Sequence, residues 1–197
     1  MVKIIKVENQ RQLNAFIKFP FNLYKDNPYW VPPLIMDEKF TLNKHKNPAF
    51  EFCEAELWLA YKDGQLAGRI CGIINHSYIK KWGNSYARFG WVDFIDDYEV
   101  SGALFATVEK WAKEKGMEYV HGPLGFCDLD KEGMLVEGFE EMGTFITIYN
   151  HPYYMKHIET YGYKKDAEWI EIDITLPDEE TAAKITALAN RAKEKYG

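Results

Sequence analysis

The chain has 197 residues, of which 47% are hydrophobic and 16% aromatic, so it can form one domain with a substantial core and is not disordered. Its formal charge of -6 argues against a nucleic-acid partner, because such surfaces need basic residues to pair with phosphates. The three cysteines are widely spaced and form neither a disulfide framework nor a zinc motif, so no metal is expected. No apolar run approaches the length of a membrane span, and we expect a cytoplasmic protein with no membrane partner.

The first part of the chain predicts a strand, a helix and an aromatic segment. Residues 2–7 form a short apolar strand, and apolar residues at helical spacing follow from Glu8 to Pro20. We expect the helix to be interrupted there, because proline lacks an amide hydrogen. Residues 21–34 are rich in aromatic side chains and proline, which excludes a long regular element. We expect these rings to pack on the core, and an aromatic wall of a ligand pocket is the alternative.

The clearest local signal is a hairpin. An Asp-Gly pair joins two apolar runs, residues 56–61 and 66–74, and this pair favours a tight turn because such turns need positive φ. A third strand is expected over residues 87–95. Gly90 lies within it and indicates a bulge or a close approach of another backbone.

The second half predicts two helices and two strands. Residues 99–115 have the apolar spacing of an amphipathic helix, and an apolar strand follows at 119–126. Residues 167–174 alternate strictly between polar and apolar types, which predicts a one-sided antiparallel strand. A final helix is expected from Pro177 to the end of the chain.

Another helix is expected between the last two strands. Pro152 suits its first turn, with Asn150 or His151 as its cap, and Gly162 suits its end. His151 is expected to be a structural hydrogen-bonding group, although a histidine can titrate near neutral pH.

A long loop with several acidic side chains precedes that helix. Asp128, Asp130, Glu132 and Glu137 follow the carboxyl end of a predicted core strand, where sites of α/β sheets tend to lie. They can hold a cationic amine, and one of them can deprotonate it as a general base. Alternating oxygen ligands for a divalent cation are a second reading, without the full calcium-loop pattern. A solvated loop is the third.

The order of these elements resembles the GNAT (Gcn5-related N-acetyltransferase) fold over residues 2–174. The hairpin of residues 59–70 is similar to the family's second and third strands, and the segment from Asn150 to Tyr163 is similar to its late Asn…Gly-Phe segment. The ordered Gly, Glu and Tyr positions between 122 and 154 resemble a poorly characterised bacterial branch of GNAT-like proteins, whose members are longer than this chain.

This resemblance implies an α/β (α+β) fold. We expect a mixed, mostly antiparallel sheet with a splayed parallel strand pair, and helices on both faces. Residues 1–174 would form the GNAT-like acyltransferase domain. Residues 175–197 would form a C-terminal helix, a connector to a second domain that is missing here.

The resemblance also implies an acetyl-CoA site. The pantetheine would lie between the splayed strands and the pyrophosphate at the start of the 99–115 helix, where free N–H groups favour an anion. The cofactor-binding residues would then be Trp91, Val92, Asp93, Phe94, Ser101, Gly102, Ala103 and Asn150. The sequence departs from the family where Glu99 replaces a basic or amide residue, and Leu104 a small one. A helix capped by a carboxylate, with no bound anion, is the alternative.

The implied reaction is acetyl transfer from acetyl-CoA to a small amine. Glu132 or Glu137 would be the base, and Tyr154 the acid that protonates the leaving thiolate. The family's tyrosine position is Ile158 in this chain, so Tyr154, one turn earlier on the same helix face, would replace it. Two rivals remain. One is a non-catalytic binding module with a degenerate CoA site, and the other is a half-protein that needs a second domain or a homodimer partner.

Overall fold

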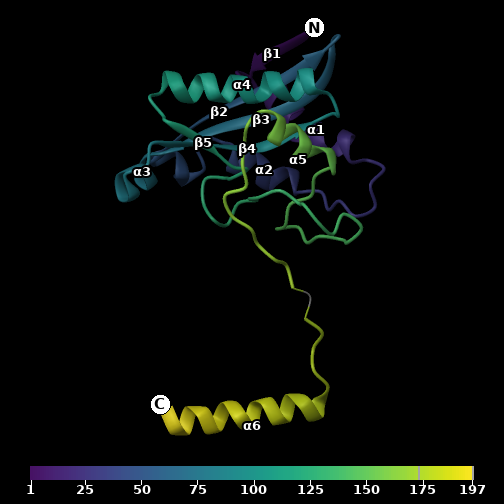
Figure 1. The fold of residues 1–197 in the computed structure, drawn as a ribbon, viewed down its shortest axis with the longest axis vertical. Coiled ribbons are helices and arrows are strands. Elements are labelled where there is room, and N and C mark those ends of the chain that lie inside the picture. Colours follow the sequence, from purple (N-terminus) through teal and green to yellow (C-terminus); the bar gives the residue numbers. More distant parts are fainter. Residues whose placement is uncertain (173, 197) are drawn as a thin grey trace. The chain divides into compact units, whose positions relative to one another are not determined.

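The computed structural model describes residues 1–172 and 174–196 (Figure 1). The chain divides into two units, the first covering residues 1–163 and the second beginning at Lys164. The first unit contains the five-stranded sheet and the residues of the candidate site.

The sheet has five strands that follow one another in space as they do in sequence. They are β1 (Val2–Lys6), β2 (Cys53–Lys62), β3 (Gln65–Asn75), β4 (Tyr86–Phe94) and β5 (Tyr119–His121). The first four strands pair antiparallel, whereas β4 and β5 pair parallel. The predicted mixed, mostly antiparallel sheet with a parallel pair is therefore confirmed.

Helices lie on both faces of this sheet, as predicted (Figure 1). The helices of the first unit are α1 (Gln10–Leu23), α2 (Ile35–Thr41), α3 (His76–Trp82), α4 (Tyr98–Glu114) and α5 (Tyr153–Thr160), with a short 3-10 turn at Pro48–Glu51. Leu104 and Val108 of α4 share one apolar core with Trp58, whereas Phe16 of α1 shares the other with Leu59. Successive side chains of a strand point to opposite faces, so β2 supplies both cores.

The hairpin and the third strand form as the sequence predicts. Asp63 and Gly64 both have positive φ, 50° and 82°, between β2 and β3. The register of β3 against β4 shifts near Gly90, and Trp91 beside it has φ 43°. A Cβ on Gly90 would lie 2.3 Å from the carbonyl oxygen of Leu124, so the expected close backbone approach is confirmed.

The expected interruption at Pro20 is wrong, because α1 continues through it. A proline within a helix leaves the carbonyl four residues earlier without its usual partner. Here that carbonyl belongs to Phe16, and it accepts a hydrogen bond from Nη1 of Arg69 at 3.0 Å. A side chain from β3 thus replaces the missing backbone bond and allows the helix to continue to Leu23.

The strand expected at 119–126 is shorter, since β5 ends at His121. Gly122 follows with φ 150°, and Pro123 has no N–H to extend a ladder. The chain then crosses β4 closely, and Leu124 N–H donates to the Phe89 carbonyl at 2.8 Å.

The second unit contains one helix, α6 (Glu179–Tyr196), whose first turn Asp178 caps by accepting from Thr181 N–H. The strand predicted at 167–174 is wrong for residues 167–172 and 174, and Asp173 lies outside the described residues. Alternation alone does not make a strand, because a strand needs a hydrogen-bonded neighbour, and none pairs with this segment within the described residues. None of the described helices combines the length and apolarity that crossing a bilayer requires.

Candidate functional site

The parallel strands β4 and β5 separate after a short pairing. They pair only from Tyr86 to Arg88 of β4, and β5 ends at His121, the partner of Arg88. Ile95 N–H donates to the Ala67 carbonyl of the antiparallel neighbour, so the alternation of the ladder turns the backbone groups of Phe94 toward the opposite, splayed edge. This edge is where the sequence resemblance implies a pantetheine.

Helix α5 meets this edge with two tyrosine hydroxyls. Tyr154 accepts a hydrogen bond from the Phe94 N–H at 3.1 Å, and Tyr153 donates to the Phe94 carbonyl at 2.6 Å. The ring of Tyr154 stacks on that of Phe94 with centroids 4.2 Å apart. The protein's own side chains therefore engage both backbone groups of Phe94.

A buried polar cluster lies behind Tyr154. The Tyr24 hydroxyl, at the C-terminal end of α1, is 2.8 Å from Oδ1 of Asp93 and 2.9 Å from the Tyr154 hydroxyl. Tyr154 also contacts Asp93 Oδ1 at 3.3 Å. Burial, followed by the charge of Asp93, raises the pKa of both tyrosines well above the usual value, so both are protonated at neutral pH.

Arg69 holds the other side of the Asp93 carboxylate. Its Nε donates to Asp93 Oδ2 at 2.7 Å, and the same guanidinium binds the Phe16 carbonyl. Both ionic side chains are buried, and each also forms hydrogen bonds to other groups, which fixes the position of the pair. The cluster joins α1, β3, β4 and α5 at the point where the strands separate.

A carboxylate from α2 lies beside the bulge. Trp91 donates from Nε1 to Glu38 of α2 at 2.8 Å, and its ring contacts Phe126. Burial lowers the pKa of Lys131, whereas the charges of Glu38 and Asp93 oppose that shift. The Glu38 carboxylate thus borders the bulge, and the Lys131 amine interacts electrostatically with Glu38 and Asp93.

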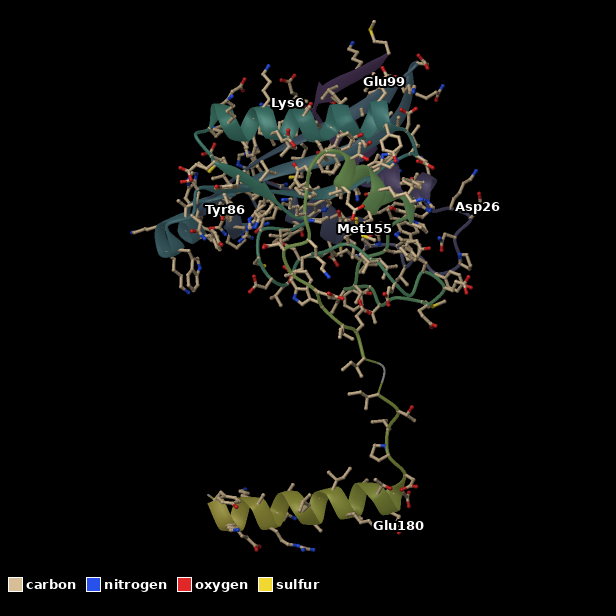
Figure 2. The ribbon with its side chains drawn as sticks, in the orientation of Figure 1. Lys6, Asp26, Tyr86, Glu99, Met155 and Glu180 are labelled. Atoms are coloured by element: carbon tan, nitrogen blue, oxygen red, sulfur yellow. The ribbon has the colours of Figure 1, made fainter. Side chains whose placement is uncertain are left out.

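The first turn of α4 is capped by the protein itself. Oδ1 of Asp97 accepts from the N–H groups of Glu99 and Val100 at 2.9 and 3.3 Å. A hydrogen bond from Lys62 lowers the pKa of Asp97, which keeps this cap charged. Figure 2 shows Glu99 at this end of α4. The helix start is therefore capped by a carboxylate, which is the alternative to an anion site that the sequence offers.

Side chains of α5 and its C-terminal end cover the same turn. Ser101 Oγ lies 2.7 Å from Nδ1 of His157, whose Nε2 contacts Asp96 at 2.9 Å, and both Ser101 and His157 are buried. A Cβ on Gly102 would lie 3.2 Å from the Tyr161 hydroxyl. With N–H groups capped, carboxylates adjacent and a tyrosine over Gly102, this arrangement of the turn does not fit a pyrophosphate.

Side chains of the acidic loop and of Asn150 form hydrogen bonds with the loop's own backbone. The side chain of Asn150 is buried and binds the backbone of Leu135 twice. Its Oδ1 accepts from the Leu135 N–H at 2.7 Å, and its Nδ2 donates to the Leu135 carbonyl at 3.1 Å. Asp130 accepts from the N–H groups of Phe126 and Cys127 at 2.7 and 3.2 Å. These contacts fold the loop back on its own two ends.

The two glutamates proposed as bases differ in their surroundings. Burial, then the charges of Asp128 and Asp130, raises the pKa of Glu132, which Arg88 opposes, whereas Glu137 is exposed. Within the described ranges, no group of three or more His, Cys, Asp or Glu side chains is arranged to hold a metal.

The structure therefore brings some predicted site residues together and adds others. Asp93, Phe94 and Tyr154 meet directly, whereas Ser101 and Gly102 lie under α5. Sequence reasoning missed two members of this cluster. Arg69 carried a signal, because it is a charged residue within an apolar strand, whereas Tyr24 carried no local signal.

Comparisons place the chain among acetyltransferase-like folds. No family model matches it. Protein YghO of Escherichia coli (strain K12) is 37% identical over 157 residues, which cover 80% of this chain and 40% of YghO. The bacterial ceramide synthase of Caulobacter vibrioides is 29% identical over 165 residues, covering 83% of this chain and 43% of the synthase. The chain thus spans less than half the length of these curated relatives.

A solved structure supports the fold. A predicted acetyltransferase from Clostridium acetobutylicum, solved with acetyl-CoA, matches with a TM-score of 0.54 at 11% identity, over 88% of this chain and 96% of that chain. The chain has a GNAT-like fold.

Proposed function

We propose that the first unit is an N-acyltransferase domain that moves an acyl group from a thioester to a primary amine. The observation that carries this proposal is the separation of β4 and β5 beside a bulge at Trp91, with the buried Tyr154–Asp93 cluster next to it. The GNAT-like fold and the relative named as a ceramide synthase support it, since a ceramide is an amide of a long-chain amino alcohol.

The donor in this proposal is an acyl thioester, with acetyl-CoA as the simplest example. Its thioester would lie along the splayed edge of β4, near Trp91, Val92 and Phe94. A backbone N–H near Val92 would polarise the thioester carbonyl, because a fixed donor stabilises the charge that develops on that oxygen. Ser101, Gly102 and Ala103 are predicted from the sequence to contact the donor, but we propose no such contact for them, because Asp97 caps that turn and Tyr161 covers it. Asn150 stays a predicted donor contact.

The acceptor is an amine, and two classes compete. A small amine is the simpler expectation. A long-chain amino alcohol is favoured by the ceramide synthase relative and by α2, where Met36 and Phe40 are 77% and 52% exposed. The same helix carries Glu38, which accepts a hydrogen bond from Trp91 at the bulge. A carboxylate for the ammonium group and exposed apolar side chains on the same helix suit an amphipathic amine.

Tyr154 is the proposed catalytic hydroxyl, since it lies against the Phe94 N–H at the splayed edge. Glu132 and Glu137 stay candidate bases. The raised pKa of Glu132 suits this role better than the exposure of Glu137 does, because a base works best when its pKa lies near the working pH.

A binding module without catalysis is the second candidate. It is favoured by the occupation of the Phe94 backbone by Tyr153 and Tyr154, and by the capped first turn of α4. In this reading α5 has replaced the donor.

The test is amide formation measured by mass spectrometry. Purified protein is mixed with acetyl-CoA or palmitoyl-CoA and with a small diamine or sphinganine, and Tyr154→Phe serves as the impaired variant. Amide from wild type, reduced about 100-fold in Tyr154→Phe, supports the enzyme. Absence of amide in all four pairs, with no heat of acetyl-CoA binding in calorimetry, contradicts it and favours the module.

A further inference from the structure

A pocket of about 260 Å³ opens between α3, β4 and residues 126–128. Its volume lies just below the range of roughly 300–1,000 Å³ that is typical of ligand sites, so it suits a small molecule. None of the described residues that line it belongs to the cluster of Tyr24, Asp93 and Tyr154. The pocket is therefore a different site from the one proposed for acyl transfer.

Arg88 is a buried cation in the wall of this pocket, with 9% of its surface exposed. Arg69, which is equally buried, pairs with Asp93 at 2.7 Å, whereas Arg88 forms no ion pair with a carboxylate in the described part of the chain. Burial raises the pKa of Glu132 and the charge of Arg88 opposes this rise, so these two groups interact without pairing. A buried charge is costly unless an opposite charge accompanies it, so Arg88 suits an anion that enters the pocket.

The guanidinium of Arg88 is held in place and still has donors to offer. Its Nη1 donates to the carbonyls of Gly125 and Phe126 at 3.0 and 3.3 Å, and its central carbon lies 5.2 Å from the centre of the Tyr78 ring. A guanidinium carries five N–H groups, and these bonds use only the two of Nη1. Nε and Nη2 form the remaining edge, which is the planar fork that binds a carboxylate through two parallel hydrogen bonds.

The other charged side chains of the lining define the charge of the ligand. They are Lys81 and Asp128, so two cations and one carboxylate leave a net charge of +1 around the pocket. This charge balances a monoanion, whereas a dianion such as a phosphate ester would lie near Asp128 with one charge uncompensated.

Aromatic rings form much of the remaining wall. Phe52, Tyr78 and Phe126 all line the pocket, and Phe126 is buried. Such rings bury the apolar part of a ligand. We propose that this pocket binds a small monocarboxylate with an apolar body, whose carboxylate lies on Arg88 and whose body lies among the three rings. This goes beyond the proposed function and does not depend on it.

The test is isothermal titration calorimetry of the whole chain with phenylacetate and with hexanoate. One of them should bind with a Kd of about 1 mM or tighter. The neutral phenylacetamide should bind at least about tenfold more weakly than phenylacetate, because hydrogen bonds to a charged group are stronger. No binding of either acid at that concentration, or equal binding of phenylacetate and its amide, would overturn the proposal. Tighter binding of phenyl phosphate would overturn the assignment of a monocarboxylate.

Two variants assign the binding to this pocket. Arg88→Lys keeps the charge but loses the fork, and it should weaken the acid at least about tenfold. Because Arg88 also holds two loop carbonyls, the exposed Lys81 supplies a second variant outside the core. Lys81→Met should weaken the acid about two- to fivefold, as expected for an exposed charge. Lys80→Met is the matched control, since Lys80 is an exposed neighbour on α3 that does not line the pocket. Equal affinities of the Lys80 and Lys81 variants, with Arg88→Lys binding as wild type does, would overturn the assignment.

Cys127 reports directly whether the pocket is occupied. It lines the pocket and is exposed, whereas Cys53 and Cys71 are buried. Phenylacetate should slow the alkylation of Cys127 by iodoacetamide, followed by the mass of the intact protein, and phenylacetamide at the same concentration should not. Unchanged alkylation under conditions where calorimetry shows binding would place the acid elsewhere and overturn the proposal.

Discussion

Gly90 lies where the loop after β5 crosses the bulged strand β4. A Cβ there would lie 2.3 Å from the carbonyl oxygen of Leu124, and a backbone atom cannot move aside by changing rotamer as a side chain can. We predict that Gly90→Ala lowers the free energy of unfolding by about 3 kcal/mol, the upper range for inserting a group into a packed site. Urea denaturation measures this.

Gly116→Ala is the control for Gly90→Ala. Gly116 has φ 78° and open space around its Cβ position, so the change costs only the strain of a left-handed conformation, about 1 kcal/mol. Equal losses in the two variants would show that the approach of Leu124 to Gly90 relaxes freely.

Lys131 gives a pH-dependent prediction at the same scale. Burial lowers its pKa in the folded protein below the unfolded value of about 10.4, so the unfolded chain binds more protons between these two values. Stability of the wild type therefore rises with pH through that window. Lys131→Met should melt higher than wild type at pH 7, and the difference should shrink toward pH 10.

The exposed Lys44 provides the comparison for Lys131. Lys44→Met should leave the melting temperature close to that of wild type at both pH values. A lower melting temperature of Lys131→Met at pH 7 would mean that attraction to Glu38 and Asp93 outweighs burial, against the direction of the pKa shift.

At the scale of elements, helix α4 depends on the cap that Asp97 provides. Its carboxylate satisfies two N–H groups that would otherwise lack partners. Asp97→Ala should cost about 1 kcal/mol of unfolding free energy, measured by chemical denaturation, whereas Asp97→Asn should retain most of it because asparagine caps equally well. A full loss in Asp97→Asn would instead assign the effect to the ion pair with Lys62.

The elements that sequence predicts well are those whose signals are local. The Asp63-Gly64 turn and the apolar stripe of α4 need only neighbouring residues, and both form as predicted. The predicted interruption at Pro20 is wrong because the side chain that satisfies the Phe16 carbonyl, Arg69, is distant in sequence. The strand predicted over residues 167–172 does not form, because an alternating pattern favours a strand only where a neighbouring strand can pair with it.

At the scale of the molecule, the candidate site is assembled from distant parts of the chain. Tyr24 ends α1, Arg69 lies in β3, Asp93 in β4 and Tyr154 in α5. Of these the sequence singled out Asp93 and Tyr154, through a resemblance and not through any contact. Burial and hydrogen bonding between such residues follow from topology, which no local pattern encodes.

The same assembly predicts how a donor is recognised. The first turn of α4 is capped by Asp97 and covered by Tyr161 at Gly102, so a donor should gain little there from its pyrophosphate. If the first unit transfers acyl groups, acyl-pantetheine should be used with a kcat/KM within about tenfold of acyl-CoA, equivalent to about 1.4 kcal/mol of transition-state binding.

Paired kinetics with the two thioesters check this prediction, with the acyl chain and the amine held constant. Asp97→Ala provides the matched test, because it exposes two N–H groups and removes a negative charge at the helix start. That variant should prefer acyl-CoA more strongly than wild type does. A wild-type preference above about 100-fold for acyl-CoA would contradict the prediction, because it requires the pyrophosphate to be bound tightly. The first turn of α4 would then have to release its own cap when the donor arrives.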